Sequence, residues 1–143
     1  MSTPGTTFQV AIDCAEPHPL ARFWSEAMHY EVEDSNDQIL GLIEQGLLSR
    51  DETTEIDGRL FFTVAVAISD PAGKGPRVLF QQVPEPKTVK NRVHLDLRIP
   101  ADEHEAEVKR LEALGATRLW DGQQGPHSWV TMADPEGNEF CVS

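Results

Sequence analysis

The fold is decided by the stretch Ser128-Trp-Val-Thr-Met-Ala-Asp-Pro-Glu-Gly-Asn-Glu-Phe-Cys-Val142. Both ends of this stretch, residues 128–133 and 138–142, are rich in β-branched and aromatic residues and predict two strands. The four residues between them predict a tight turn, because aspartate suits its first position, Pro135 fixes φ at its second, and glycine tolerates φ > 0 at its end. The stretch is therefore predicted to form a β-hairpin.

A looser copy of this signature lies 64 residues earlier, where Asp70-Pro-Ala-Gly73 separates two strand-like runs. The first half of the chain predicts strands over residues 8–13, 30–33, 59–69 and 77–83, with a helix that starts near residue 15. The second half predicts a strand over 92–99, a helix over 101–114, a strand over 116–120 and the closing hairpin. Both halves therefore read βαβββ, which indicates a duplicated unit.

The two halves differ by one insertion. Aligning their first strands places Gln9 against His94, after which the turn follows 61 residues later in the first half and 40 in the second. The difference of 21 residues matches a predicted short helix and a polar, acidic surface loop between residues 36 and 58. We expect one domain over residues 1–143, with modules at 7–83 and 91–143 and a proline-containing linker between them.

Composition excludes several classes of partner. The chain has 143 residues, enough for about one domain, and its formal net charge is −12. Phosphate backbones need a basic surface, so we expect no nucleic acid and no anionic membrane as partner. The acidic charge is compatible with a cationic ligand, or it serves only solubility.

Location is predicted from what the sequence lacks. No apolar run reaches the ~20 residues of a membrane helix, and the N-terminus shows no signal-peptide pattern. Two cysteines make no disulfide scaffold and are expected as buried, reduced thiols. A cytoplasmic location is therefore expected.

Four segments together resemble a known family: Leu20-Ala-Arg-Phe-Trp24, Val78-Leu-Phe-Gln-Gln-Val-Pro-Glu-Pro-Lys87, Lys90-Asn-Arg-Val-His-Leu-Asp-Leu97 and Ala133-Asp-Pro-Glu-Gly-Asn-Glu-Phe-Cys-Val142. The chain resembles the glyoxalase/bleomycin-resistance group, the vicinal oxygen chelate superfamily, and in particular the small glyoxalase-like proteins of bacteria. The resemblance implies an α+β fold, in which two tandem βαβββ modules form a curled, open-barrel cleft, and a homodimer. It does not fix the chemistry, because the superfamily spans isomerases, dioxygenases and drug-binding proteins.

The resemblance also implies where a metal would bind. Metal-using relatives place one ligand on the first and last strand of each module, commonly His and Glu, and the metal acts as a Lewis acid on the substrate. The corresponding positions here hold Gln9, Gln81, His94 and Cys141, with Glu139 two residues before Cys141 on the same face. His94 alone is a clear ligand, since neutral amides suit hydrogen bonding better. We expect no metal quartet, with a divalent metal at His94 as the alternative.

The expected function is binding of a small polar organic molecule in the cleft, as in drug- or metabolite-binding relatives. The alternative is a lyase or isomerase of the vicinal oxygen chelate type, with His94 and Glu139 as a catalytic acid/base pair. His94 can also be a satisfied strand histidine, Glu139 an exposed edge-strand residue, and the tryptophans ordinary core. The residues expected to bind the ligand are Gln9, Gln81, Asp96, His127, Trp129 and Cys141.

Overall fold

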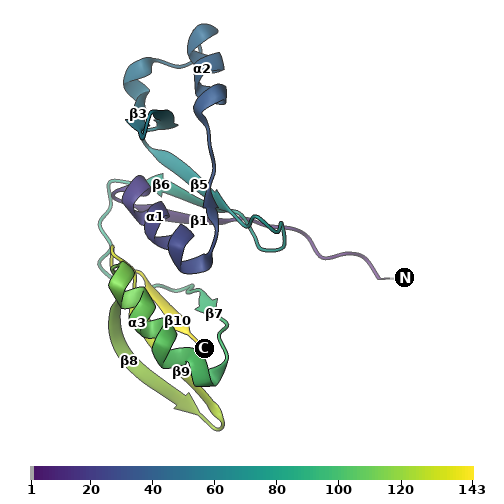
Figure 1. Ribbon diagram of the computed structural model, residues 1–143, viewed down its shortest axis with the longest axis vertical. Coiled ribbons are helices and arrows are strands. Elements are labelled where there is room, and N and C mark those ends of the chain that lie inside the picture. Colours follow the sequence, from purple (N-terminus) through teal and green to yellow (C-terminus); the bar gives the residue numbers. More distant parts are fainter. Residues whose placement is uncertain (1) are drawn as a thin grey trace.

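Two sheet-based modules make up the molecule in the computed structural model, which describes residues 2–143 (Figure 1). The first module contains β1 (Val10–Cys14), α1 (Pro17–Met28), β2 (Glu31–Val32), α2 (Asn36–Glu44), a 3₁₀ helix η1 (Arg50–Glu52), β3 (Thr53–Ile56), β4 (Arg59–Phe62), β5 (Ala65–Ser69) and β6 (Val78–Gln82). The second module contains β7 (Asp96–Leu97), a 3₁₀ helix η2 (Ala101–Glu103), α3 (His104–Leu114), β8 (Thr117–Gln124), β9 (His127–Ala133) and β10 (Glu139–Val142).

The two four-stranded sheets share one topology. Their strand orders are β1-β6-β5-β2 and β7-β10-β9-β8, so each module places its last strand between its first and third. The first and last strands pair in parallel in both modules, and the other pairs are antiparallel. The predicted duplication of a βαβββ unit is therefore confirmed, in an α+β fold whose sheets stay open rather than closing into a barrel.

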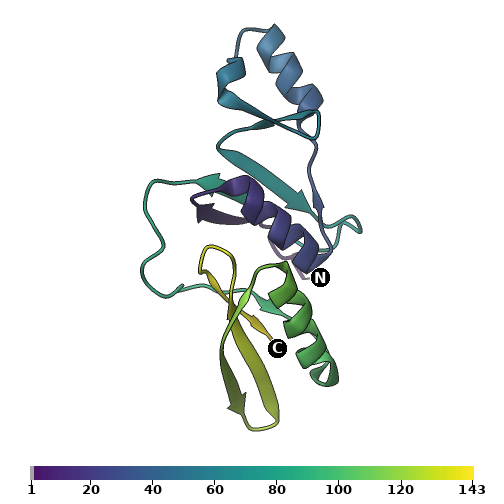
Figure 2. The same ribbon diagram turned by 60° about the vertical axis from the view of Figure 1, so that its left-hand side comes forward.

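Each sheet carries one helix on one face, and the two helices are in contact, with α1 above α3 in Figures 1 and 2. Helix α1 begins with proline and buries its apolar stripe, including Leu20, Phe23 and Trp24. Helix α3 buries Val108 and Leu111. Within residues 2–143 no helix has the length and apolarity needed to cross a membrane.

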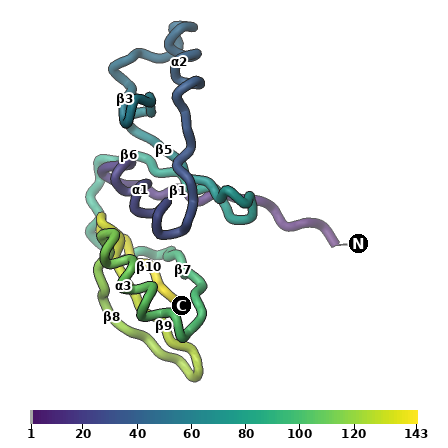
Figure 3. Tube along the Cα trace, viewed as in Figure 1, coloured from purple at the N-terminus to yellow at the C-terminus, as the bar shows by residue number. Residues whose placement is uncertain are grey.

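The inserted segment differs from its prediction. Residues 49–58, expected as a surface loop, form η1 and strand β3, which pairs with β4 as a hairpin. The connecting residues Asp57 and Gly58 have φ values of 51° and 79°, as a two-residue hairpin turn with positive φ requires. The Asp-Gly pair signalled this hairpin, but the acidic composition around it concealed the strand. This extension and the N-terminal segment project from the body of the molecule (Figures 1 and 3).

The Asp134–Gly137 turn also joins the modules. The Asp134 carboxylate is 3% exposed and accepts a 3.0 Å hydrogen bond from the indole of Trp24 on α1. The Glu136 carboxylate accepts the backbone N–H groups of Ala15 (2.7 Å) and Glu16 (2.9 Å), directly before α1. The Phe140 ring lies 4.9 Å from that of Trp24, so one hydrophobic core spans both modules.

Candidate functional site

A row of four paired residues crosses the open face of the second sheet. Asp96 on β7 pairs with Cys141 on β10, Cys141 with Thr131 on β9, and Thr131 with Trp120 on β8. Alternate residues point to opposite faces of a strand, so the neighbours of this row, such as Val142, turn into the core beneath α3. The side chains of this row therefore lie on the face of the sheet that α3 does not cover.

A cavity of about 370 Å³, here called the second-module cavity, lies over this row. Trp120, 48% exposed, and the half-buried Trp129 contribute its aromatic surfaces. Trp129 pairs with Gly122 on β8, and a Cβ atom at Gly122 would lie only 2.0 Å from the indole. Its full lining is Lys90, His94, Asp96, Trp120, Trp129, Thr131, Glu139, Cys141 and Ser143.

Three potential ligand atoms meet on the cavity floor. His94 Nδ1 lies 3.0 Å from Asp96 Oδ1, so the carboxylate can orient the imidazole and leave Nε2 available. Burial raises the pKa of the Cys141 thiol, which lies 3.5 Å from the hydroxyl oxygen of Thr131. One ligand atom each from His94, Asp96 and Cys141 fall within 4.8 Å of one another.

This donor set fits a divalent metal, but not as the quartet of metal-using relatives. An imidazole nitrogen, a carboxylate oxygen and a thiolate sulfur are ligands that Zn²⁺ accepts. All three donors come from the second module, whereas Gln81, the residue expected to match Cys141 in the first module, lies outside the cavity. The residues that would hold a metal are therefore His94, Asp96 and Cys141.

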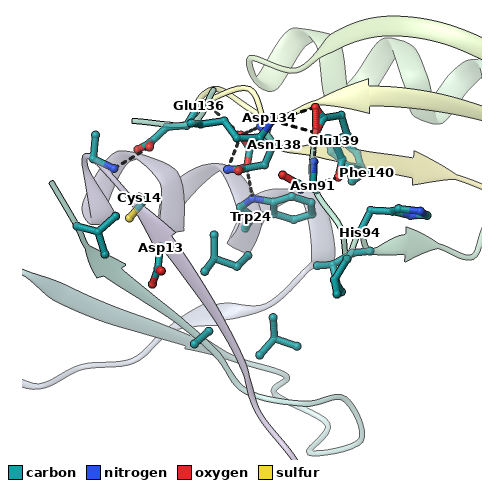
Figure 4. Close-up of a pocket in the computed structure, with 18 of the residues that line it drawn as sticks. Asp13, Cys14, Trp24, Asn91, His94, Asp134, Glu136, Asn138, Glu139 and Phe140 are labelled. Carbon is teal, nitrogen blue, oxygen red and sulfur yellow. Dashed lines mark hydrogen bonds and ion pairs between the residues drawn. The ribbon is translucent and has the colours of Figure 1, made fainter. Parts of the chain in front are cut away.

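Glu139 lines the cavity, but its carboxylate is bound by residues of the linker. Its carboxylate lies 3.0 Å from Lys87 Nζ and accepts the backbone N–H of Asn91 at 2.8 Å. Burial acts to raise the pKa of Glu139, but the hydrogen bonds from Asn91 and Lys87 outweigh it and hold the pKa below its usual value. Figure 4 shows this carboxylate directed at Asn91 and the His94 ring pointing away from it. The geometry favours a linker anchor over a proton-transfer partner of His94.

A second cavity of about 400 Å³ lies between the modules, beside β1, the linker and the Asp134 turn (Figure 4). Cys14 lies in its wall, and burial, helped by the Glu136 carboxylate, raises the pKa of this thiol to about 12. A thiol with that pKa is almost fully protonated at neutral pH and is a poor nucleophile. Cys14 is therefore a structural residue.

Three of the residues expected in the cleft lie outside the second-module cavity. Gln9 is exposed and accepts a 3.0 Å hydrogen bond from Arg77, Gln81 is exposed on the first sheet, and His127 is exposed at the start of β9. The pairing registers constrain the expected alignment. Asp13 pairs with Gln81 as Asp96 pairs with Cys141, so Gln9 cannot match His94 while Gln81 matches Cys141. One of these two expected matches is displaced by two residues.

Of the other predicted residues, the structure brings His94, Asp96, Trp129, Glu139 and Cys141 to one cavity. Sequence reasoning missed Lys90, Thr131 and Ser143 in its lining, and Gly122 beneath Trp129. Thr131 carried a usable signal, since it lies two residues after Trp129 and shares its face of the strand. Lys90 precedes β7 and follows no strand pattern that could have placed it.

Known structures share this architecture at low sequence identity. The fosfomycin resistance protein FosX from Mesorhizobium loti superposes with a TM-score of 0.64 and 10% identity, covering 98% of this chain and 91% of its own. A glyoxalase/bleomycin resistance protein/dioxygenase family enzyme from Burkholderia phytofirmans gives 0.60 and 14%, covering 94% of each chain. FosX from Listeria monocytogenes, complexed with Mn(II) and 1S,2S-dihydroxypropylphosphonic acid, gives 0.64 and 9%, covering 99% and 90%.

At these identities the superpositions establish the fold alone. No curated protein has a significantly similar sequence. The sequence model of the glyoxalase-like domain, however, matches residues 9–143, nearly the whole chain. The chain therefore belongs to the glyoxalase-like domain family, within the vicinal oxygen chelate superfamily.

Proposed function

We propose that the protein binds a small polar organic molecule in the second-module cavity. The observation that carries this proposal is the row Asp96–Cys141–Thr131–Trp120, which places polar groups on the floor of a hollow with aromatic walls. Small-molecule sites commonly combine apolar walls with a few fixed polar groups, in cavities of roughly 300–1,000 Å³. The FosX complex with a dihydroxypropylphosphonic acid supports the proposal, because that protein of the same fold binds a small polar molecule.

Replacing Trp129 by alanine tests this proposal. Saturation-transfer NMR against a library of small polar organic molecules identifies the compounds that bind. Their affinity should fall at least about tenfold in Trp129→Ala, since ring contacts contribute about 1–3 kcal/mol. Leu119→Ala is the matched control, because it also truncates a partly exposed apolar residue but lies outside the cavity. Compounds that bind Trp129→Ala as tightly as the parent would place their site elsewhere.

A second candidate is a lyase or isomerase of the vicinal oxygen chelate type. It is favoured by the convergence of His94, Asp96 and Cys141 within 4.8 Å. A divalent metal held by these residues would polarise substrate oxygens as a Lewis acid. In this reading Asp96 orients His94, and Cys141 must lose its proton on binding the metal, against the raised pKa that burial gives the thiol.

Metal uptake is the measurement for this candidate. We expect Co²⁺ to give a sulfur-to-metal charge-transfer band that is absent in Cys141→Ser. The affinity for Co²⁺, measured from the same band, should fall at least tenfold in Asp96→Asn. Cys14→Ser is the matched control, because Cys14 lies outside this cavity. A band that persists in Cys141→Ser, or equal uptake by all three variants, would remove the metal from this site.

We further propose a cytoplasmic homodimer. The open faces of both sheets, with Gln81 on one and Cys141 on the other, are the surfaces on which a second copy would complete a cleft. Both cysteines are unpaired thiols within residues 2–143, which supports a reducing compartment. A sedimentation mass of one chain would contradict the dimer.

A further inference from the structure

One cationic side chain of the second-module cavity has no partner among the described residues. Asp96 faces His94 at 3.0 Å, and Glu139 is held by Lys87 at 3.0 Å and by the backbone of Asn91. Lys90 is the remaining charged side chain of the lining, and no residue within 2–143 forms an ion pair or side-chain hydrogen bond with it. The Lys90 ammonium group is therefore available to a ligand.

Lys90 lines the same cavity as Cys141 and Thr131, which lie on its floor. The Thr131 hydroxyl and the Cys141 thiol hydrogen-bond to each other, so one of them donates to the other and the second keeps its own donor for a ligand. A group with negative charge and acceptor oxygens would satisfy the lysine and this donor together.

The shape of the cavity selects a flat molecule. Trp129 lies against the bare backbone of Gly122, and Trp120 stands on the same strand two residues before Gly122. One exposed and one half-buried indole on the same face of a sheet favour an aromatic or conjugated body, which stacks on them at a small entropic cost.

We infer that the ligand of the second-module cavity is a small planar organic anion, such as an aromatic or conjugated carboxylate, whose charged group lies at Lys90. This inference rests on the proposed function and names the chemical class of its ligand. It reverses the cationic ligand suggested by the net charge of −12. Distant acidic side chains act weakly at physiological salt, where charge interactions are screened within about 8 Å, whereas Lys90 lines the cavity itself.

Three probes that share a phenyl ring and differ in charge test the inference: benzoate, benzamide and benzylammonium, titrated into the full chain by calorimetry or NMR. Benzoate should bind at least about tenfold more tightly than benzamide, with benzylammonium weakest. Lys90→Met should abolish the preference for benzoate, and Lys90→Arg should keep it. Lys109→Met is the matched control, because Lys109 is an exposed lysine of α3 outside the cavity.

The inference would be overturned by any of three results. These are equal affinity for benzoate and benzamide, tighter binding of benzylammonium than of benzoate, and a benzoate preference that survives in Lys90→Met. Failure of all three probes to bind would also overturn it. The proposed function fails separately, when no compound of any charge class loses affinity in Trp129→Ala. A neutral or cationic molecule that depends on Trp129 would leave the function standing and refute the anionic class.

Discussion

Replacing Asp134 by alanine should lower the free energy of unfolding by about 3–5 kcal/mol, because it leaves several buried donors without an acceptor. The carboxylate accepts hydrogen bonds from the Trp24 indole at 3.0 Å, from the backbone N–H groups of Glu136 and Asn138, and from the Asn138 amide. Because only 3% of the Asp134 surface is exposed, water cannot replace these bonds without opening the module junction. Urea unfolding followed by circular dichroism measures the loss.

The duplicated fold supplies the control for this experiment. Asp70 begins the equivalent turn of the first module and accepts the backbone N–H groups of Ala72, Lys74 and Gly75, but it is partly exposed and has no tryptophan donor. Asp70→Ala should cost much less than Asp134→Ala, because water can replace the hydrogen bonds of a solvated turn. Equal losses in the two variants would show that the turn matters locally and that the Trp24–Asp134 bond does not hold the modules together.

The second large effect is expected at Gly122. A methyl group there would lie 2.0 Å from the Trp129 indole, far inside van der Waals contact, so Gly122→Ala should displace the ring. We expect at least a tenfold loss of binding for compounds that depend on Trp129, with a stability cost of about 1–3 kcal/mol from overpacking. Probe titration and near-ultraviolet circular dichroism report the two effects.

Gly41→Ala is the matched control for Gly122→Ala. Gly41 lies in α2, and no atom surrounds the position its Cβ would take, so the substitution should be neutral or stabilising by about 0.5–1 kcal/mol. Retained probe affinity and an unchanged near-ultraviolet spectrum in Gly122→Ala would mean that Trp129 does not need this glycine.

The elements that sequence predicted well are those specified by local chemistry. The turn at Asp134 and the apolar stripe of α1 are readable because turn residues and helical periodicity are local properties. Alternation along strands also placed His94 with Asp96, and Glu139 with Cys141, on shared faces. Part of the site could therefore be predicted from local patterns alone.

What sequence could not provide depends on contacts between distant segments. A shift of two residues leaves the face of every side chain unchanged, so alternation could not show that matching Gln9 to His94 excludes matching Gln81 to Cys141. The neutralisation of Glu139 by Lys87 joins residues 52 positions apart. No periodic pattern reports the partner of a carboxylate, so the role of Glu139 follows only from its three-dimensional contacts.

The inserted extension has little thermodynamic effect on how the first sheet assembles. Val10 and Val78, which pair across β1 and β6, are 68 positions apart, whereas Asp96 and Cys141 of the second module are 45 apart. Loop-closure entropy grows only with the logarithm of loop length, so the longer first-module loop costs about 0.4 kcal/mol more to close. Such a small penalty makes the tip of the first module a position where evolution can add or remodel chain while the duplicated scaffold stays the same.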